Sequence, residues 1–329
     1  MSESVPRRHA LRELEALLLD PGWADGAGAE FLVVDFAAGE DAGPSLADAV
    51  AGVPVPVVAV GARPDTALAD AMDVWADSDD ELATIVARIR ENPTASAVLV
   101  QVLRSSVRLP VLEALALESL GYATLQSGRE FARWLGGRER RAPKPAPGHD
   151  AVLLARCDDA LELVLNTPRN RNALSVAMRD ALTEAFELVA MTPEIQQIDV
   201  RGNGPSFSAG GDLTEFGSTD DPSVAHEIRM RRMPARYLAP EAHRYHFHVH
   251  GACVGAGIEL AAFAGRVTAV EETFFQLPEV AMGLIPGAGG CVSIPRRIGR
   301  QRTAFMALTG LRVAAREALA WGLIDAIED

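Results

Sequence analysis

The chain has 329 residues, 48% of them hydrophobic, and a formal net charge of −14. This length allows one large domain or two ordinary ones with a sizeable core, and the acidic balance disfavours a general nucleic-acid binder. Three cysteines lack metal-type spacing, and no apolar run reaches membrane-spanning length. We therefore expect a cytoplasmic protein without disulfides and without a nucleic-acid or membrane partner.

The first part of the chain, residues 1–138, is predicted to be a smaller α/β lobe rich in helices. Leucines at helical spacing predict a first helix over residues 8–19. Short β-branched runs then predict strands, and helical patterns follow them, with Asn92-Pro93 as a break. The expected strands are 31–36, 54–61 and 73–76, and the expected helices are 81–91, 94–105 and one or two within 110–131. The lobe shows no phosphate loop, nucleophile elbow or metal cluster, which favours a structural or oligomerisation role.

A charged, proline-rich stretch at 139–149 is predicted to be a semi-rigid linker to a second domain, residues 150–329. Its first expected elements are a strand at 161–166, a helix from the N-cap Ser175 to about 190, and a strand at 197–201. The small residues of the run SFSAGGDL would let the backbone approach a ligand closely. The polar segment 217–241 is expected to be a mobile loop or short helix over that site.

Three histidines, His246, His248 and His250, alternate in a strand-like run and would share one face. A metal site is one interpretation. However, alternation along a strand spaces the rings by roughly 7 Å per step, and no carboxylate or cysteine accompanies them at ligand spacing. We therefore expect surface or interface histidines and no metal site.

A basic cluster follows near the end of the chain, formed by Arg296, Arg297, Arg300 and Arg302. On an acidic protein, such a cluster is typically a solvated or salt-bridged face. An anion pocket or a subunit contact is the alternative.

Two carboxylates stand out between His250 and Gly290. A glycine-rich turn in HGACVGAGIEL opens a predicted helix with Glu259 in its first turns, and Glu279 comes directly after Pro278. The neighbours of Glu259 are apolar, so its side chain is expected to be buried, where a carboxylate without a purpose is costly. We therefore interpret both residues as functional.

These residues suit chemistry beside a thioester carbonyl. Such reactions place negative charge on the carbonyl oxygen, which two converging backbone N–H groups stabilise. The glycine-rich turns at 209–211 and 255–257 could supply one N–H each, the second aided by the dipole of its helix. Two carboxyl groups close together could share the acid and base steps, because crowding raises the pKa of one of them.

Five ordered motifs resemble the crotonase family, the enoyl-CoA hydratases and isomerases, over about residues 161–325. They are NTPRNRNALS, SFSAGGDL, HGACVGAGIEL, FQLPEVAMGLIPGAGG and WGLID. The resemblance implies an α/β fold built as a spiral of ββα units, here preceded by the smaller lobe. It also implies a homotrimer or dimer of trimers, and an acyl-CoA substrate in which coenzyme A is part of the substrate and not a cofactor.

By position, the resemblance implies oxyanion-binding N–H groups at Gly211 and Ala256 and paired acids at Glu259 and Glu279. Because both acids are present, it favours an enoyl-CoA hydratase-type lyase of fatty acid metabolism, which adds water to an α,β-unsaturated acyl-CoA. The implied CoA-binding residues are Arg169, Arg171, Ala209, Gly210, Asp212, Leu213, Gly255 and Gly287.

Two departures from the family pattern leave alternatives open. Ala256 stands where the family usually has glycine, and AFAGRV follows where hydratases usually have an acidic residue. Parts of the second domain also resemble the cofactor-free dioxygenase branch that cleaves dihydroxyphenylacetyl-CoA, which has an added N-terminal lobe. Isomerisation, thioester hydrolysis, dioxygenation and a catalytically silent assembly subunit are therefore alternatives.

A third departure concerns the helices that normally follow WGLID in the family and cover the site. They do not follow it here, whereas residues 94–135 resemble them. We hypothesise that the first lobe is a degenerate crotonase-like C-terminal portion placed ahead of the core. Packing of these helices far from the core would contradict this.

Overall fold

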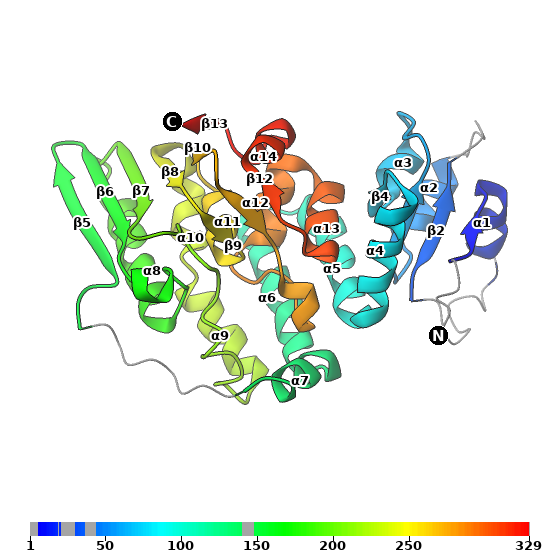
Figure 1. The fold of residues 1–329 in the computed structure, drawn as a ribbon, viewed down its shortest axis with the longest axis horizontal. Coiled ribbons are helices and arrows are strands. Elements are labelled where there is room, and N and C mark those ends of the chain that lie inside the picture. Colours follow the sequence, from blue (N-terminus) through cyan, green and yellow to red (C-terminus); the bar gives the residue numbers. More distant parts are fainter. Residues whose placement is uncertain (1–5, 19, 21–29, 37–43, 140–147, 329) are drawn as a thin grey trace.

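The computed structural model of the chain describes residues 6–18, 20, 30–36, 44–139 and 148–328. It places two groups of elements side by side, with the N-terminal sheet at one end and a larger sheet at the other (Figure 1). Most of the predicted linker, residues 140–147, lies outside the described residues.

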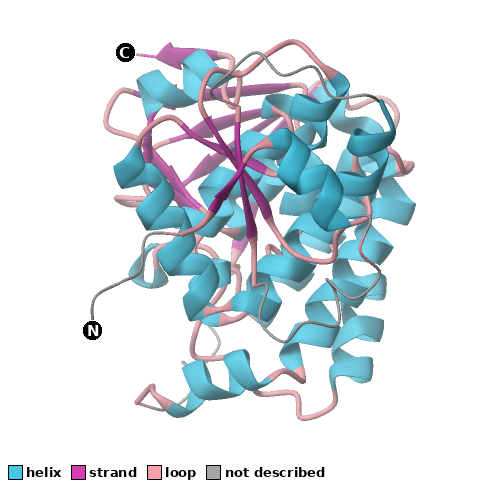
Figure 2. Cartoon of the chain, turned by 90° about the vertical axis from the view of Figure 1, so that its right-hand side faces the viewer, coloured by secondary structure: helices cyan, strands magenta, loops and turns pink. Residues whose placement is uncertain are grey.

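The N-terminal sheet has four parallel strands in the order β1-β2-β3-β4. Their bounds are β1 Arg8–His9, β2 Leu32–Asp35, β3 Val57–Val60 and β4 Val74–Ala76, and the short helices are α1 Leu11–Leu18, α2 Pro44–Ala51 and α3 Ala67–Ala71. Strands β2 and β3 are buried on both faces, as expected for short β-branched runs in a parallel sheet. Figure 2 shows helices on both sides of these strands. The three predicted strands are thus confirmed, each shorter than its sequence run.

Four further helices connect this sheet to the rest of the protein: α4 Asp79–Glu91, α5 Pro93–Ser106, α6 Val111–Gln126 and α7 Arg129–Gly136. Ser78 caps α4 by accepting a hydrogen bond from the N–H of Glu81, and Pro93 begins α5. Glu130 of α7 accepts the N–H groups of Thr94 and Ala95 at 2.7 and 2.9 Å, so it caps α5 from a distance. The break predicted at Asn92-Pro93 is confirmed.

The larger part contains a six-stranded sheet in the order β13-β10-β8-β7-β6-β5, parallel except for the pair β5–β6. Its strands are β5 Val152–Cys157, β6 Ala160–Leu165, β7 Gln197–Gly202, β8 Tyr245–Val249, β10 Arg266–Val270 and β13 Ala326–Glu328. A second sheet of three strands contains β9 Ala252–Val254, β11 Phe274–Gln276 and β12 Val313–Ala314. The chain passes from the larger sheet to the smaller one and then into a helix in β8–β9–α11 (α11 Ala256–Ala261) and in β10–β11–η3 (η3 Glu279–Met282), as in the predicted spiral of ββα units.

The helices of this part surround the two sheets. The α-helices are α8 Val176–Ala190, α9 Pro222–Arg232, α10 Ala235–Leu238, α11 Ala256–Ala261, α12 Gly290–Ile298, α13 Arg300–Thr309 and α14 Ala315–Trp321, and the 3₁₀ helices are η1 Pro168–Asn170, η2 Ala239–Arg244 and η3 Glu279–Met282. Within these described ranges, no helix combines the length and apolar character needed to cross a membrane.

The segment 217–241 is more regular than its polar sequence suggested. It contains the 11-residue helix α9, which begins at the N-cap Asp221 and packs against α6. Its contacts with α6 are polar, because Arg229 donates hydrogen bonds to Ser119 and Gln126. The sequence of α9 therefore shows no apolar stripe, even though α9 packs against α6.

Helices α5–α7 pack directly against the second part of the chain. Helix α5 contacts α12 and α13, α6 contacts α9 and α12, and α7 contacts η3. Buried residues of these N-terminal helices and of residues 151–324 form one continuous hydrophobic core, while the far face of the N-terminal sheet has its own smaller cluster. Residues 94–135 therefore pack against the core. Packing far from the core, which would have contradicted the hypothesis that they correspond to the family's C-terminal helices, is not observed.

The basic cluster forms intramolecular contacts, and those of Arg296 and Arg300 reach the N-terminal part of the chain. Arg300 pairs with the buried Asp73 at 3.0 Å, Arg297 pairs with Asp325 at 3.1 Å, and Arg302 lies over the ring of Trp321. Arg296 donates hydrogen bonds to backbone carbonyl groups. The salt-bridged interpretation is confirmed, and these groups are not gathered into an anion pocket.

Candidate active site

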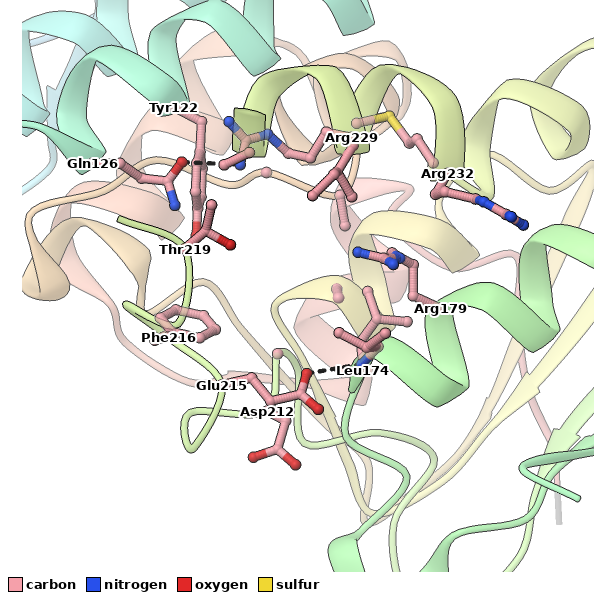
Figure 3. Close-up of a pocket in the computed structure, with 18 of the residues that line it drawn as sticks. Tyr122, Gln126, Leu174, Arg179, Asp212, Glu215, Phe216, Thr219, Arg229 and Arg232 are labelled. Carbon is pink, nitrogen blue, oxygen red and sulfur yellow. Dashed lines mark hydrogen bonds between the residues drawn. The ribbon is translucent and has the colours of Figure 1, made fainter. Parts of the chain in front are cut away.

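A cavity of about 380 Å³ lies between α6 and α7 on one side and the glycine-rich turns on the other. Six of the predicted site residues line it: Gly211, Asp212, Ala256, Glu259, Glu279 and Gly287. Figure 3 shows Tyr122, Gln126 and Arg229 at one end of this cavity and Asp212 and Glu215 at the other. The other predicted residues, Arg169, Arg171, Ala209, Gly210, Leu213 and Gly255, are not part of its lining.

The two glycine-rich turns touch each other. A Cβ on Gly210 would lie 3.0 Å from the carbonyl oxygen of Val254 and 3.6 Å from the Cα of Gly255. Both glycines also have positive φ values, 85° and 48°, which side chains disfavour. Glycine is therefore needed at these positions for the close approach, and the contact brings the N–H groups of residues 211 and 256 to the same wall of the cavity.

The N–H groups of Gly211 and Ala256 are available to a ligand. Leu174 forms an isolated parallel bridge with Gly211. In this bridge the N–H of Leu174 donates to the carbonyl of Gly210, and the N–H of Asp212 donates to the carbonyl of Leu174. The N–H of Gly211 takes no part in this bridge. Ala256 is the first residue of α11, so its N–H has no acceptor within the helix. Alanine in place of the family's usual glycine keeps this donor, because the donor is the backbone N–H of Ala256 and not a side-chain group.

Glu259 is held rigidly beside these donors. Its side chain is 2% exposed, and its Oε2 accepts hydrogen bonds from the N–H groups of Ala288 and Gly290 at 2.7 and 2.9 Å. Burial raises its pKa to about 7, although the two hydrogen bonds favour the charged form. Its carboxyl group can therefore change protonation state near neutral pH.

Glu279, at the start of η3, has its carboxyl group beside Gly255, as Glu259 does. Its Oε1 lies 2.5 Å from where a Cβ on Gly255 would be, and Oε1 of Glu259 lies 3.8 Å from that position. Its Oε2 is buried and has no hydrogen-bond partner among the described residues. Burial, and then the charge of Glu259, raises its pKa well above the usual range. These surroundings favour the protonated form of Glu279.

A third buried glutamate, Glu118 of α6, was missed by the sequence interpretation. It is 0% exposed and accepts the N–H groups of Gly289 and Cys291 at 2.7 and 2.8 Å. Glu118 and Glu259 therefore bind alternate N–H groups of one turn at the start of α12. Burial raises the pKa of Glu118, and the charge of Glu259 raises it further. The argument used for Glu259, an acid among apolar neighbours, applies equally to Glu118 and could have found it.

The far end of the cavity is polar. Arg229 of α9 donates hydrogen bonds to Ser119 and Gln126 and lies 4.5 Å above the ring of Tyr122. The Tyr122 ring in turn packs against Gly287, where a Cβ would lie 2.5 Å from a ring carbon. His226 also contacts Ser119, at 2.8 Å. Glycine at position 287 thus makes room for a side chain from the N-terminal helices.

The predicted CoA-binding arginines lie outside this cavity. Arg169 and Arg171 are exposed and belong to a turn beside the glycine-rich loop, since the carbonyl of Arg171 accepts the N–H of Ala209 at 2.9 Å. Asn170 of this turn donates a hydrogen bond to Asp212. The turn and the loop are therefore joined, and a role in binding CoA stays a prediction for both arginines.

The model of the family described as enoyl-CoA hydratase/isomerase matches residues 159–328. The chain belongs to this family. As an enoyl-CoA hydratase/isomerase family member, it acts on CoA esters.

Individual family members are moderately similar to this chain. The 2,3-dehydroadipyl-CoA hydratase of Escherichia coli is 32% identical over 176 residues, which cover 53% of this chain and 68% of that protein. The mevalonyl-coenzyme A hydratase of Aspergillus fumigatus is 30% identical, with 51% and 62% covered. The solved structure of enoyl-CoA hydratase from Thermoplasma volcanium superposes with a TM-score of 0.51 at 30% identity and covers 55% of this chain and 73% of that one. These alignments confirm the predicted crotonase-like α/β fold.

Proposed function

We propose that this family member is an enoyl-CoA hydratase-type lyase that adds water to the double bond of an α,β-unsaturated acyl-CoA. The observation that carries the proposal is the meeting of the buried Glu259, the half-buried Glu279 with its buried Oε2, and two backbone N–H groups in one cavity. Hydration of an enoyl-CoA thioester needs both kinds of group. The N–H groups stabilise the negative charge that the thioester oxygen gains, and the carboxyl groups move protons at the neighbouring carbons.

In this mechanism, the N–H groups of Gly211 and Ala256 bind the thioester oxygen. Ionised Glu259 takes a proton from water as the water oxygen bonds to the β carbon, and protonated Glu279 donates its proton to the α carbon. Both carboxyl groups lie on one side of the substrate, so the addition is syn. Exchange of one proton from Glu259 to Glu279, directly or through solvent, restores the site. The chemistry needs only groups of this chain, and we propose that coenzyme A enters as part of the substrate.

Helices α5–α7 support a further part of the proposal. Tyr122 and Gln126 of α6 and Phe131 of α7 line the cavity, so one chain supplies both the carboxyl groups and the cover. We propose that these helices take the place of the C-terminal helices that cover the site in the family. A homotrimer or dimer of trimers remains our prediction for the assembly, and light scattering of the purified protein tests it.

The decisive experiment is an absorbance assay with crotonyl-CoA, which loses its conjugated enoyl thioester on hydration. Loss of the conjugated absorbance with formation of 3-hydroxybutyryl-CoA supports the proposal. A double-bond shift would indicate an isomerase, and free coenzyme A would indicate a thioesterase. No turnover of any enoyl-CoA, together with oxygen uptake on an aryl-acetyl-CoA, would indicate the dioxygenase.

A bell-shaped dependence of kcat/KM on pH is expected for crotonyl-CoA hydration. Glu259 must be ionised to act as a base, so kcat/KM should rise as pH increases through about 7, the pKa to which burial raises this residue. Glu279 must be protonated, and burial raises its pKa well above the usual range for a carboxyl group, so kcat/KM should fall again as Glu279 loses its proton at higher pH. Initial rates between about pH 5 and 10 test this. A rate that is independent of pH across neutrality would contradict the assignment.

The polar end of the cavity suggests an acyl group with a polar or anionic terminus. Arg229 lines the cavity, and its guanidinium, on which the charge of Glu118 also acts, donates hydrogen bonds to the neutral side chains of Ser119 and Gln126. The similar proteins named above are hydratases of dehydroadipyl-CoA, whose acyl chain ends in a carboxylate, and of mevalonyl-CoA. We therefore propose that Arg229 binds the far end of the acyl group.

Arg229→Met should lower kcat/KM selectively for a carboxylate-ended enoyl-CoA. A hydrogen bond to a charged group contributes about 1.5–3 kcal/mol, so the loss is expected to be roughly 10- to 150-fold, with a small change for crotonyl-CoA. Arg231→Met is the matched control, because Arg231 is exposed on the same helix and pairs with Glu227. Equal losses with both substrates would show that Arg229 only maintains the packing of α9 on α6.

A further inference from the structure

One face of the six-stranded sheet carries a cluster of histidine and carboxylate side chains outside the cavity. His246 and His248 share this face of β8, opposite the face on which Tyr245 packs against α8. Asp199 of β7 is the register partner of His246. Glu328 lies on β13, one strand beyond β10, near the C-terminal end of the described chain (Figure 1). Sequence spacing alone had shown no carboxylate near these histidines, and the folded sheet supplies two.

We propose that Asp199, His246 and His248 bind a divalent transition-metal ion of the Zn²⁺ type. One ligand atom of each residue can be chosen so that all three lie within 4.8 Å of one another. Oδ1 of Asp199 is 2.8 Å from Nε2 of His248 and 3.7 Å from Nδ1 of His246. Ligands of a tetrahedral Zn²⁺ at about 2.0–2.1 Å are roughly 3.3–3.5 Å apart. The observed spacings bracket this separation.

The two imidazole rings are much closer than strand alternation predicted. Their centroids are 3.8 Å apart, whereas alternation implies roughly 7 Å, because both rings turn toward Asp199. The turn of the rings brings one nitrogen of each imidazole to the same carboxylate oxygen, Oδ1 of Asp199.

The remaining ring nitrogens have the partners that metal ligands typically have. Nδ1 of His248 lies 3.2 Å from Oε2 of Glu328, and Nε2 of His246 lies 2.9 Å from Oγ1 of Thr268. A histidine that binds a metal through one nitrogen usually donates the other N–H to a carboxylate or another oxygen, which fixes the ring. This second set of contacts is independent of the ligand distances and points to the same kind of site.

The cluster is partly enclosed and leaves room for a fourth ligand from solvent. The side chains of Asp199, His246 and His248 are 23%, 18% and 12% exposed. None of these residues lines the cavity, so the proposed ion takes no part in hydration. Through Glu328 it would connect the central strands β7 and β8 to β13, which indicates a structural role. This inference does not depend on the proposed function.

Titration of the untagged full chain, stripped of metal by a chelator, tests the site. We expect calorimetry to show one Zn²⁺ bound per chain, and Co²⁺ to develop the visible absorption of a low-symmetry site. Zn²⁺ should also raise the melting temperature, and Mg²⁺, which prefers oxygen ligands, should not. X-ray absorption of the Zn²⁺-loaded wild type should show two imidazole ligands. No stoichiometric uptake, or a Zn²⁺ shell without imidazole, would overturn the proposal.

Three variants locate the site within the wild-type fold, as checked by circular dichroism. His248→Gln should abolish binding. Glu328→Gln should weaken it by roughly 10- to 100-fold, because only the partner of a ligand is changed. His250→Gln should leave it unchanged, since the His250 ring contacts the carbonyl of Gly204 instead. Unchanged Zn²⁺ uptake in His248→Gln would overturn the proposal, and if this variant does not fold, the wild-type absorption spectrum decides.

Discussion

Glu259→Gln and Glu279→Gln are each expected to lower kcat for crotonyl-CoA hydration by roughly 10²- to 10⁴-fold, the range typical of a lost general acid or base. Glutamine keeps the size of the side chain but can neither accept the proton of water nor deliver one to the α carbon. The KM should change little, because the N–H groups of Gly211 and Ala256 still bind the thioester. Initial rates over a range of crotonyl-CoA concentrations measure kcat and KM for each variant.

The two carboxyl groups should also be strongly non-additive. If they act in one proton-transfer step, the double variant should be only slightly slower than the slower single variant. Glu272→Gln is a suitable control, because Glu272 is exposed in the turn between β10 and β11. Hydration that survives either single substitution at more than a tenth of the wild-type rate would exclude the two-carboxylate mechanism, although the chain would remain a family member acting on CoA esters.

Glu118→Gln is expected to reduce kcat by up to about 10²-fold, although Glu118 does not line the cavity. Glu118 binds the N–H groups of Gly289 and Cys291, and its loss would loosen the turn whose other N–H groups position Glu259. Glu118→Ala should in addition lower the free energy of unfolding by about 1–3 kcal/mol for each buried N–H left without an acceptor. Chemical denaturation measures this loss.

The dependence of kcat/KM on pH distinguishes a role of Glu118 in positioning the catalytic carboxyl groups from a general loss of stability. The charge of Glu118 contributes to raising the pKa of Glu279, so Glu118→Gln should move the alkaline limb of kcat/KM to lower pH. Glu113→Gln on the exposed side of α6 should change neither the rate nor the profile. A loss of stability with an unmoved profile would show that Glu118 acts only as a structural residue.

Sequence reasoning identified the carboxyl groups and the turns because each lies in a short motif whose local geometry follows from its residues. Gly210 and Gly255 adopt positive φ values as such turns require, and Glu259 and Glu279 follow on rigid elements. The strands β2 and β3 and the helices α4 and α5 were predicted for the same reason, since their periodicity is local. Helix α9 was less evident, because its packing on α6 relies on arginine hydrogen bonds and not on an apolar stripe.

The sequence by itself determined the family, the ββα architecture and the residues of the two glycine-rich turns, because motif order and hydrophobic pattern are properties of neighbouring residues. Tertiary structure alone decided which distant side chains meet. Glu118 reaches the turn at residues 289–291, and Asp199 reaches His246 and His248 across paired strands. Parallel strand pairing and helix packing join residues far apart in the chain, and no local spacing encodes those contacts.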